Sequence, residues 1–314
     1  MTFVLRRLLL SCLYGALFAG VAAQAQPAVG TELRGARDAQ LQSALESAVV
    51  GLGLQTPLAQ HQLALALVDV TDARRPRLAM LNGDDMMYAA SLPKIGILVG
   101  ALAEADSGRF VLDGERVQAM HRMIRESSNS DATRVLKWVG EQRLLDWLQS
   151  PRFKLYDAQA GGGLWVGKGY GPEPAYRRDP VANLSHGATV YQVARLYTML
   201  AAGTLFKPET SALMLDILSR PGIQHKFVRA LAGMPEVRMF RKSGTWKDFH
   251  ADSALVEVAG RRYVMVGIAH DPAGGEWLVQ LGRAMHALIV GDRAAAATQR
   301  VQASSVVGHA RTPG

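Results

Sequence analysis

The chain has 314 residues, of which 49% are hydrophobic and 20% are charged. This length and composition exclude a small disulfide-stapled scaffold and argue against wholesale disorder or a protein with many membrane spans. Lysine and arginine number 35 against 27 acidic residues, a formal charge of +8, which would suit an anionic partner such as nucleic acid, a phospholipid surface or an acidic polymer.

The first 25 residues have the pattern of a secretory signal. Arg6 and Arg7 precede an apolar run over 8–22, and the sequence Ala23-Gln24-Ala25 then supplies a small-x-small cleavage site. A membrane anchor is the alternative, but the run is shorter than the ~20 apolar residues that span a bilayer. We therefore expect a periplasmic or secreted protein, without a stable membrane span after processing, that begins at Gln26.

The only cysteine, Cys12, lies inside this apolar run and would leave with it, unless the segment is a lipoprotein signal. The mature chain would then have no thiol for disulfides, metal binding or catalysis. Loss of Arg6 and Arg7 lowers the formal charge from +8 to +6. An exported protein meets cell wall and envelope lipids rather than DNA, so we expect no nucleic-acid partner.

Hydrophobic periodicity predicts the elements of the first half of the chain. Apolar positions over 32–52 fit an amphipathic helix, and the runs 62–70 and 77–81 fit two strands. The apolar segment 86–104 contains Pro93, which a helix tolerates only in its first turn, so a helix is predicted to start near Ser91. The segment 116–149 then has a helical spacing with one charged face.

The second half begins with a long loop and ends in strands. Residues 151–183 are dense in Gly, Pro, Tyr and Arg, and a loop of that length is usually functional. The remaining predictions are helices over 189–200 and 209–218, strands over 237–245, 251–259 and 261–269, a helix over 276–290, and a tail without periodicity over 294–314.

This order predicts an α+β fold, with an antiparallel sheet flanked by helices and a separate all-helical part. We divide the chain into a signal peptide (1–25), one catalytic domain (26–292) and a disordered tail (293–314).

Three short motifs carry the candidate chemistry. Ser91-Leu92-Pro93-Lys94 opens a predicted helix, Ser127-Ser128-Asn129 falls in the charged helical region, and Lys242-Ser243-Gly244-Thr245 ends a predicted strand. A serine hydroxyl needs a base to become a nucleophile, and Lys94 lies three residues from Ser91, on the same helix face. Repulsion from Lys242 would lower the pKa of Lys94 toward the neutral amine that a general base requires.

The other motif residues complete an acyl-transfer site. Ser127 can pass a proton to a leaving nitrogen, and the Asn129 amide can hold a substrate carbonyl or Lys94. Gly244 allows close approach to the strand, where the Thr245 N–H could join that of Ser91 in an oxyanion hole. Each motif has an ordinary alternative: a helix cap for Ser91, a solvated turn for Ser127 to Asn129 and an exposed strand end for Lys242. Their joint order and context favour catalysis.

With these motifs, the chain resembles a class A β-lactamase-type serine hydrolase of the β-lactamase and penicillin-binding DD-peptidase superfamily, from about Glu32 to Val290. Met123-Ile124 before Ser127 and the helix over 189–200 support the match. The resemblance implies β-lactam hydrolysis through a Ser91 acyl-enzyme, and hence antibiotic resistance. It also implies roles: Lys94 as base partner, Ser127 as proton shuttle, Lys242 as electrostatic organiser, Asn129 as substrate contact, and Ser243 and Thr245 on the substrate carboxylate.

The sequence departs from the family pattern at three places. Ser128 stands where the family has aspartate, and only 36 residues separate Ser91 from Ser127, fewer than is usual. The family's loop glutamate, which activates the deacylating water, is matched only by Glu173-Pro174. Glu173 is therefore our candidate for the deacylation base, with Asp179 second, although Arg178-Asp179 also fits an ion pair that braces the loop.

Two other functions stay open. A penicillin-binding DD-carboxypeptidase would use the same residues on cell-wall peptides without fast β-lactam deacylation. A noncatalytic envelope-binding protein would need Ser91 and Lys94 to point apart. His250 and Asp252 could be a metal pair, but without a histidine cluster a buried hydrogen-bonded pair fits better. We expect no metal or organic cofactor, a small-molecule β-lactam or cell-wall peptide as substrate, and a monomer.

Overall fold

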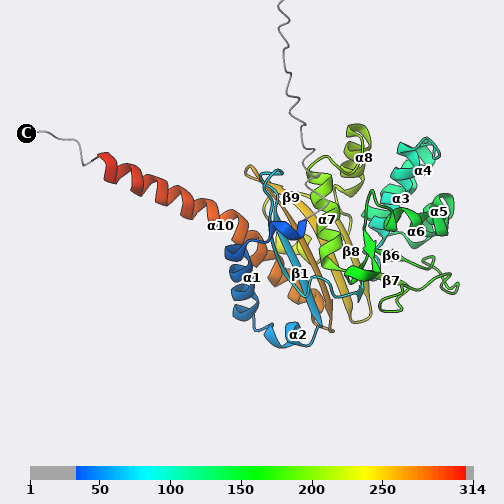
Figure 1. Cartoon of the computed structure of the whole chain (residues 1–314), viewed down its shortest axis with the longest axis horizontal. Coiled ribbons are helices and arrows are strands. Elements are labelled where there is room, and N and C mark those ends of the chain that lie inside the picture. The colour runs from blue at the N-terminus through cyan, green and yellow to red at the C-terminus, as the bar shows by residue number, and fades with distance from the viewer. Residues whose placement is uncertain (1–32, 309–314) are drawn as a thin grey trace, which may run out of the picture.

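The computed structural model describes residues 33–308, and its centre is a five-stranded sheet (Figure 1). The strands are β1 (Leu63–Asp69), β2 (Arg77–Leu81), β8 (Arg238–Trp246), β9 (Phe249–Val258) and β10 (Arg261–His270). Their order is β2-β1-β10-β9-β8, and every neighbouring pair is antiparallel. One edge of the sheet is therefore β8, the strand that carries Lys242 to Thr245.

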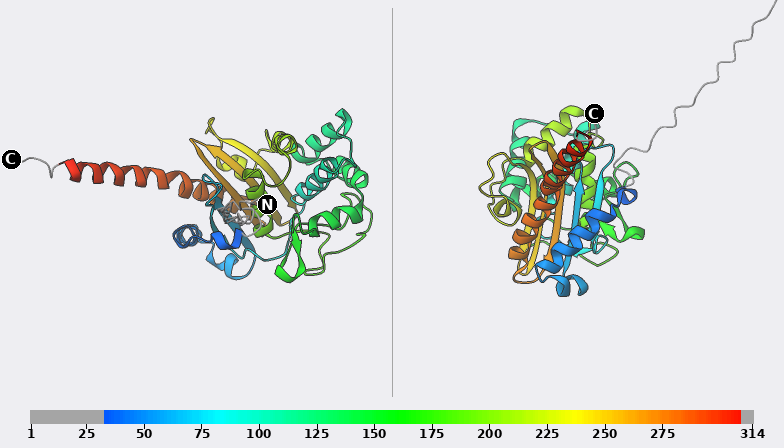
Figure 2. Two further views of the ribbon diagram at one scale, coloured as in Figure 1. Left: turned by 45° about the horizontal axis from the view of Figure 1, so that its top comes forward. Right: turned by 90° about the vertical axis from the view of Figure 1, so that its left-hand side faces the viewer.

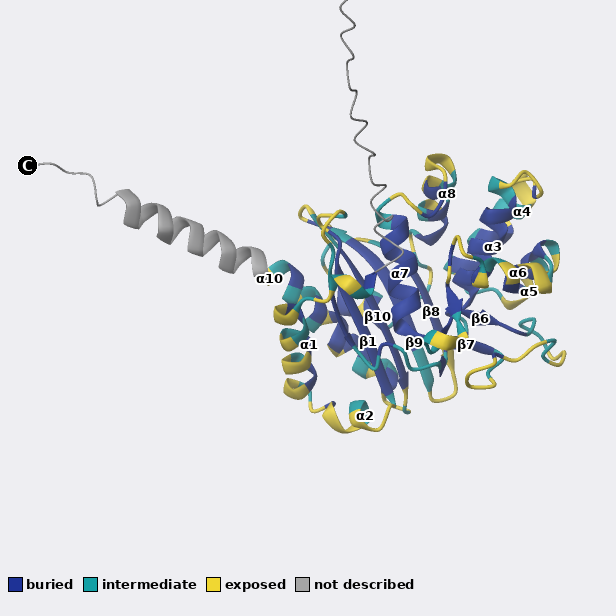
Figure 3. Ribbon diagram, in the orientation of Figure 1, coloured by how far each residue is buried: buried dark blue, intermediate teal, exposed yellow. Residues whose placement is uncertain are grey.

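The sheet is covered on both faces, because its strands are apolar on both. All seven residues of β1 are buried. Successive side chains of a strand point to opposite faces, so Leu63, Leu65 and Leu67 join one hydrophobic core while Ala64, Ala66 and Val68 join the other. The buried residues accordingly run through the sheet and the helices beside it, and exposed residues gather on the outer helix faces and loops (Figure 3).

Helices from both ends of the chain cover one face of the sheet. They are α1 (Ala39–Gly51), capped by the Asp38 side chain, the short α9 (Phe227–Ala230) and α10 (Gly274–Gly308). α10 continues well beyond the predicted helix end at Val290 and projects away from the sheet (Figures 1 and 2). The tail predicted to lack periodicity is thus helical up to Gly308, because its Ala294–Ala297 run favours a helix and no proline interrupts it.

The other face packs against α7 (Val190–Ala201) and a helical lobe beyond it. The lobe is formed by α3 (Lys94–Asp106), α4 (Gly114–Arg125), α5 (Asn129–Val139), α6 (Glu141–Gln149) and α8 (Pro208–Leu218), and it lies on the side of the sheet away from α10 (Figures 1 and 2). The first eleven residues of α3 are all buried, so this helix is the centre of the lobe, and Lys94 at its start is buried with it.

Short elements complete the described chain. The elements not yet given are η1 (Leu33–Ala36), α2 (Gln55–Ala59), β3 (Met87–Tyr88), β4 (Tyr156–Asp157), η2 (Ala158–Ala160), β5 (Gly162–Gly163), β6 (Trp165–Val166) and β7 (His186–Ala188). The predicted long loop contains three very short strands, β4, β5 and β6, rather than irregular backbone alone. β3, β7 and β6 form a small sheet beside the Ser91 turn.

The predicted fold class, an antiparallel sheet flanked by helices with a helical part, is confirmed. The predicted signal peptide, its cleavage site and Cys12 lie outside the described residues. Within residues 33–308 there is no helix long and apolar enough to cross a membrane.

Candidate active site

Ser91 lies in a tight turn immediately before α3. The Leu92 N–H donates to the Ala89 carbonyl at 2.9 Å, and the Lys94 N–H donates to the Ser91 carbonyl at 3.3 Å, so the helix proper begins three residues later than predicted. Ala90 has a φ of +51°, which side-chain-bearing residues rarely adopt outside turns and functional sites. The Ser91 hydroxyl is half-buried and makes no hydrogen bond to another described residue.

The Lys94 amine points to the connection between α4 and α5. Its Nζ donates to the Ser127 carbonyl at 2.5 Å, to Asn129 Oδ1 at 2.7 Å and to Ser127 Oγ at 3.3 Å. Burial of the side chain lowers the pKa of Lys94 to about 7, because a charged amine is poorly solvated there. Lys94 can therefore exchange a proton near neutral pH, as a general base must.

The sequence predicted that Ser127 and Asn129 lie within one helical segment. They lie instead at the break between α4 and α5. Ser127 has a φ of +58°, and Ser128 is the N-cap of α5, where its Oγ accepts the Asp131 N–H at 3.2 Å. This cap explains why a serine can stand where the family has aspartate. Asn129 is exposed while its oxygen is held by Lys94.

Lys242 reaches the same serine from the edge strand. Its Nζ donates to Ser127 Oγ at 3.0 Å and to the Ser243 carbonyl at 2.6 Å. The Ser127 hydroxyl therefore lies between the two buried amines. Burial and, after it, repulsion from Lys94 hold the pKa of Lys242 well below its usual value. For Lys94 the main cause is burial, whereas the sequence suggested repulsion from Lys242.

Gly244 brings the edge strand against the Ser91 turn. A Cβ atom at Gly244 would lie 2.2 Å from the Ala89 carbonyl oxygen and 2.7 Å from the backbone nitrogens of Ser91 and Leu92. Only glycine permits this approach. The Ser91 N–H donates to no acceptor within the described chain, so it is free for an oxyanion between the turn and β8.

Sequence reasoning missed one cation at this strand. Lys226 is buried, has a φ of +51° and donates to the Gly244 carbonyl and to Thr245 Oγ1, both at 2.6 Å, and to the Ala251 carbonyl at 3.2 Å. Because Thr245 Oγ1 accepts from Lys226, the exposed Thr245 hydroxyl keeps its proton for another acceptor. No motif surrounds Lys226, so no sequence signal could have located it.

Asp252 pairs with Arg241, and not with His250 as the sequence suggested. Its carboxylate accepts from Arg241 Nε at 2.8 Å and Nη2 at 2.7 Å, with both side chains buried. Arg241 is therefore not free to bind a substrate carboxylate, and Asp252 forms no pair with His250. Within residues 33–308, no group of three or more His, Cys, Asp or Glu side chains could hold a metal ion.

The two candidate acids of the long loop, Glu173 and Asp179, do not contact Lys94 in the described structure. Glu173 is exposed and lines a shallow hollow with Ser130, Thr133 and Tyr170, and no hydrogen bond joins it to Ser91, Lys94 or Ser127 in the described structure. Asp179 is buried, and its carboxylate accepts the N–H groups of three residues, Val181, Ala182 and Leu184. It braces the loop through backbone hydrogen bonds rather than through the predicted ion pair with Arg178.

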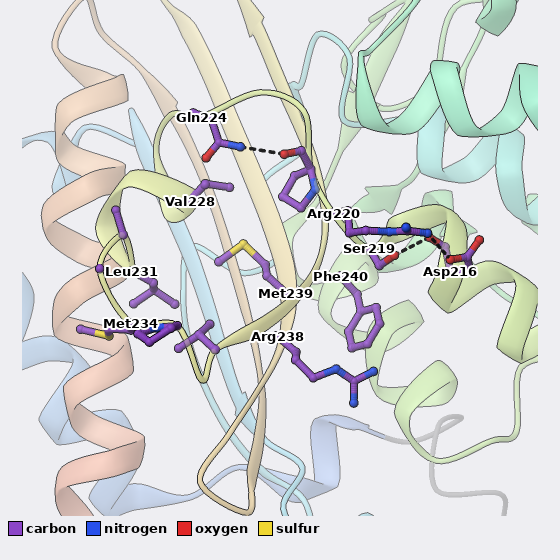
Figure 4. A pocket seen from close by; sticks show the side chains of 15 residues that line it. Asp216, Ser219, Arg220, Gln224, Val228, Leu231, Met234, Arg238, Met239 and Phe240 are labelled. Atoms are coloured by element: carbon purple, nitrogen blue, oxygen red, sulfur yellow. Dashed lines mark hydrogen bonds and ion pairs between the residues drawn. The ribbon is translucent and has the colours of Figure 1, made fainter.

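A separate cavity of about 760 Å³ lies at the opposite end of β8 (Figure 4). It is lined by apolar side chains such as Leu231, Met234 and Met239, and also by the charged residues Asp216 and Arg220. None of the candidate catalytic residues lines it. The strand β8 connects the two places: its residues Arg238 to Phe240 line the cavity, and Lys242 to Thr245 lie further along the same strand.

Fold and site together define a class, the serine hydrolases of the β-lactamase and penicillin-binding-protein superfamily. The sequence model of the Beta-lactamase enzyme family matches residues 117–289, more than half of the chain. The chain belongs to this family. No curated protein sequence matches it.

Solved structures with the same fold include both kinds of protein in this superfamily. PBP-A is 18% identical with a TM-score of 0.59, over 79% of this chain and 95% of that chain. A point mutant of PBP-A, solved as an acyl-enzyme complex with penicillin-G, is 20% identical with a TM-score of 0.60, over 79% and 95%. A β-lactamase from Sphaerobacter thermophilus DSM 20745 is 16% identical with a TM-score of 0.60, over 78% and 96%. At these identities the likeness concerns the fold.

Proposed function

We propose that the protein is an exported serine hydrolase that opens the amide of a β-lactam through an acyl-enzyme on Ser91. The observation that carries the proposal is the Ser127 hydroxyl between the amines of Lys94 and Lys242, at 3.3 and 3.0 Å. Two buried amines around one hydroxyl form a path for a proton, and Gly244 brings the edge strand against the backbone of Ser91 beside that path. N-terminal sequencing of periplasmic material tests export: we expect a start at Gln26, and a start at Met1 or a lipid on Cys12 would contradict it.

In the proposed acylation, Ser91 Oγ attacks the lactam carbonyl and its proton passes to the neutral Lys94 amine. The oxyanion is held by the N–H groups of Ser91 and Thr245. When the C–N bond breaks, Ser127 gives its proton to the leaving nitrogen and receives one from Lys94, which returns to its neutral form. Lys242 keeps the Ser127 hydroxyl in place, and Asn129, Ser243 and Thr245 contact the substrate amide and carboxylate.

Deacylation is assigned to Glu173, which would accept a proton from the water that attacks the ester. General-base catalysis of this kind contributes typically ~10²–10⁴-fold, so Glu173→Gln should acylate at the parent rate but accumulate a long-lived adduct on Ser91. Glu209→Gln, an exposed acid on α8, is the control. Turnover of penicillin by Glu173→Gln at the parent rate would make Glu173 an ordinary loop residue, and Asp179 the next acid to test.

One observation favours the second candidate, a penicillin-binding DD-carboxypeptidase. Glu173 is exposed, and the loop residue that contacts Lys94 is Tyr170 rather than a carboxylate. A site without a carboxylate near the ester would release a β-lactam slowly. A parent enzyme whose penicillin adduct never clears, and which removes a terminal residue from cell-wall peptides, would establish this second function.

A further inference from the structure

An aromatic side chain from the long loop contacts both the candidate base and the turn of the candidate nucleophile. The Tyr170 ring centroid lies 4.5 Å from Lys94 Nζ, within the range of a cation–π interaction. The Tyr170 hydroxyl donates to the Ala90 carbonyl at 3.3 Å, and Ala90 is the residue with positive φ that precedes Ser91. One side chain thus connects Lys94 to the backbone of the Ser91 turn.

Tyr170 is fixed by contacts on both sides. Its N–H donates to Thr133 Oγ1 on α5 at 2.9 Å, and at Gly169 a Cβ would lie 3.3 Å from the Thr133 side chain, so the loop backbone runs close against the helix. On its other side lies the His186 ring, with 4.2 Å between the centroids and an angle of 35° between the ring planes. The loop therefore holds the Tyr170 ring in one place relative to Lys94.

His186 is uncharged in this arrangement. Its Nε2 lies 3.0 Å from the Lys168 carbonyl, which can only accept, so Nε2 carries the proton. Burial lowers the pKa of His186 to about 4. The groups that face the Lys94 amine are then Lys242 from β8, neutral His186 behind Tyr170, the uncharged Ser127 and Asn129, and the Tyr170 ring. Within the described chain no carboxylate contacts Lys94, so its charged form is favoured by three neutral groups with negative potential: the Ser127 carbonyl, Asn129 Oδ1 and the Tyr170 ring.

We propose that Tyr170 is a positioning residue for acyl transfer: its ring holds the Lys94 amine against Ser127 and Asn129, and its hydroxyl fixes the carbonyl that precedes Ser91. The inference rests on the proposed function, because it assigns Lys94 and Ser91 their roles. It assigns two separable tasks to one side chain, one for the ring and one for the hydroxyl.

Two substitutions separate these tasks. Tyr170→Phe keeps the ring beside Lys94 and loses only the bond to Ala90, whereas Tyr170→Leu keeps an apolar neighbour and loses the ring. The pKa of Lys94 is measured in each protein by NMR of ¹³C-labelled lysine, and the rate constant of acylation by penicillin is measured against pH. Thermal unfolding confirms that each variant is folded, and Tyr170→Met replaces Tyr170→Leu if the latter is not.

We expect Tyr170→Leu to lower the pKa of Lys94 by about 0.5 unit or more, because the charged amine loses its ring partner. The acidic limb of the acylation profile should move to lower pH by the same amount. Tyr170→Phe should keep the parent pKa and acylate about 3- to 10-fold more slowly, since one hydrogen bond that orders the turn is lost. Equal pKa values in all three proteins, or a higher value in Tyr170→Leu, would overturn the proposal. If penicillin does not acylate the parent, the proposed function fails, and the NMR pKa values still decide whether Tyr170 holds Lys94.

Discussion

At the scale of single residues, the site is marked by two buried lysines that have no carboxylate partner. Lys94 and Lys242 are both fully buried, and neither forms an ion pair with another described residue. An unpaired buried charge is costly in free energy. Burial therefore lowers the pKa of a lysine and favours its neutral form. Two such lysines around one serine hydroxyl are the arrangement that the proposed proton transfer requires.

The coupling between these lysines gives a prediction of pH dependence. Lys94 must be neutral to act as a base, so acylation should rise with pH through its pKa of about 7. Lys242→Ala removes a like charge and opens the site to water, and both changes raise the pKa of Lys94. The acidic limb of the acylation profile should therefore move to higher pH. Lys137→Ala, an exposed lysine on α5, is the control, and an unchanged limb with full activity would remove Lys242 from the mechanism.

Gly244 gives a second prediction at the same scale. In Gly244→Ala the new methyl group would lie 2.2 Å from the Ala89 carbonyl oxygen, so the strand and the Ser91 turn must separate. Displacement of an oxyanion-hole donor costs ~10²–10³-fold in rate, and we expect a loss of that order in the acylation rate constant. Gly114→Ala, where the added Cβ meets nothing within 4 Å, should acylate normally. Parent-like acylation by Gly244→Ala would show that this close contact is not needed.

Some residues of the site could be predicted from the sequence and some could not. Ser91, Lys94, Ser127 and Lys242 belong to short motifs whose residue types state their chemistry, and the structure brings Lys94, Ser127 and Lys242 into contact. Tyr170 and Lys226 belong to no motif. Their positions depend on where a long loop and a short helix fold back onto the site, and this is decided by tertiary packing.

At the scale of elements, the connection between α4 and α5 positions Ser127. Asp131 on α5 accepts from Arg122 Nε on α4 at 2.9 Å and from Arg134 Nη2 at 2.6 Å. The hydrogen bond from Arg122 is the main cause that lowers the pKa of Asp131 to about 2. The carboxylate therefore joins the two helices on either side of the break and stabilises their arrangement.

The low pKa of Asp131 has a consequence for stability. Because the folded-state pKa is below the ordinary value of 3.8, the stabilisation is complete above about pH 4 and is lost as the pH falls toward 2. Asp131→Asn should lower the free energy of unfolding by ~1–2 kcal/mol at neutral pH. This range is kept small because the two arginines are partly exposed and solvent weakens their interaction with the carboxylate. The difference from the parent should shrink between pH 4 and pH 2 in urea unfolding. Asp146→Asn, at an exposed acid on α6, is the control and should change the free energy of unfolding little. If Asp131→Asn lost the same free energy of unfolding at every pH, the role given to the Asp131 carboxylate would be contradicted.

Long, strongly patterned elements were predictable, and short ones were not. The predicted strand 77–81 coincides with β2, and the three C-terminal strands agree with β8, β9 and β10 to within one or two residues. The two-residue strands of the loop have no periodicity to detect, and the break after Glu126 was missed because charged helical spacing continues on both sides of it. A capping serine is the signal that could have located it.

At the scale of the whole molecule, the site lies where the edge of the sheet meets the helical lobe. The sheet is held between two hydrophobic cores, and its free edge β8 faces the helical lobe that supplies Lys94 and Ser127 (Figure 1). One of these cores continues from the sheet through α7 into the helical lobe, so the sheet edge and the lobe that carry the site share one body of apolar packing. The sequence predicted both parts, but not the distances between them.

The central claim is that Ser91 becomes acylated. The most direct measurement is intact-mass and peptide-mass analysis of the protein after a brief incubation with benzylpenicillin, in parallel with Ser91→Ala. We expect the parent to gain the mass of one penicillin on the peptide that contains Ser91, and Ser91→Ala to gain none. A parent that gains no mass on this peptide while it is folded, or an adduct that forms equally in Ser91→Ala, would contradict the account.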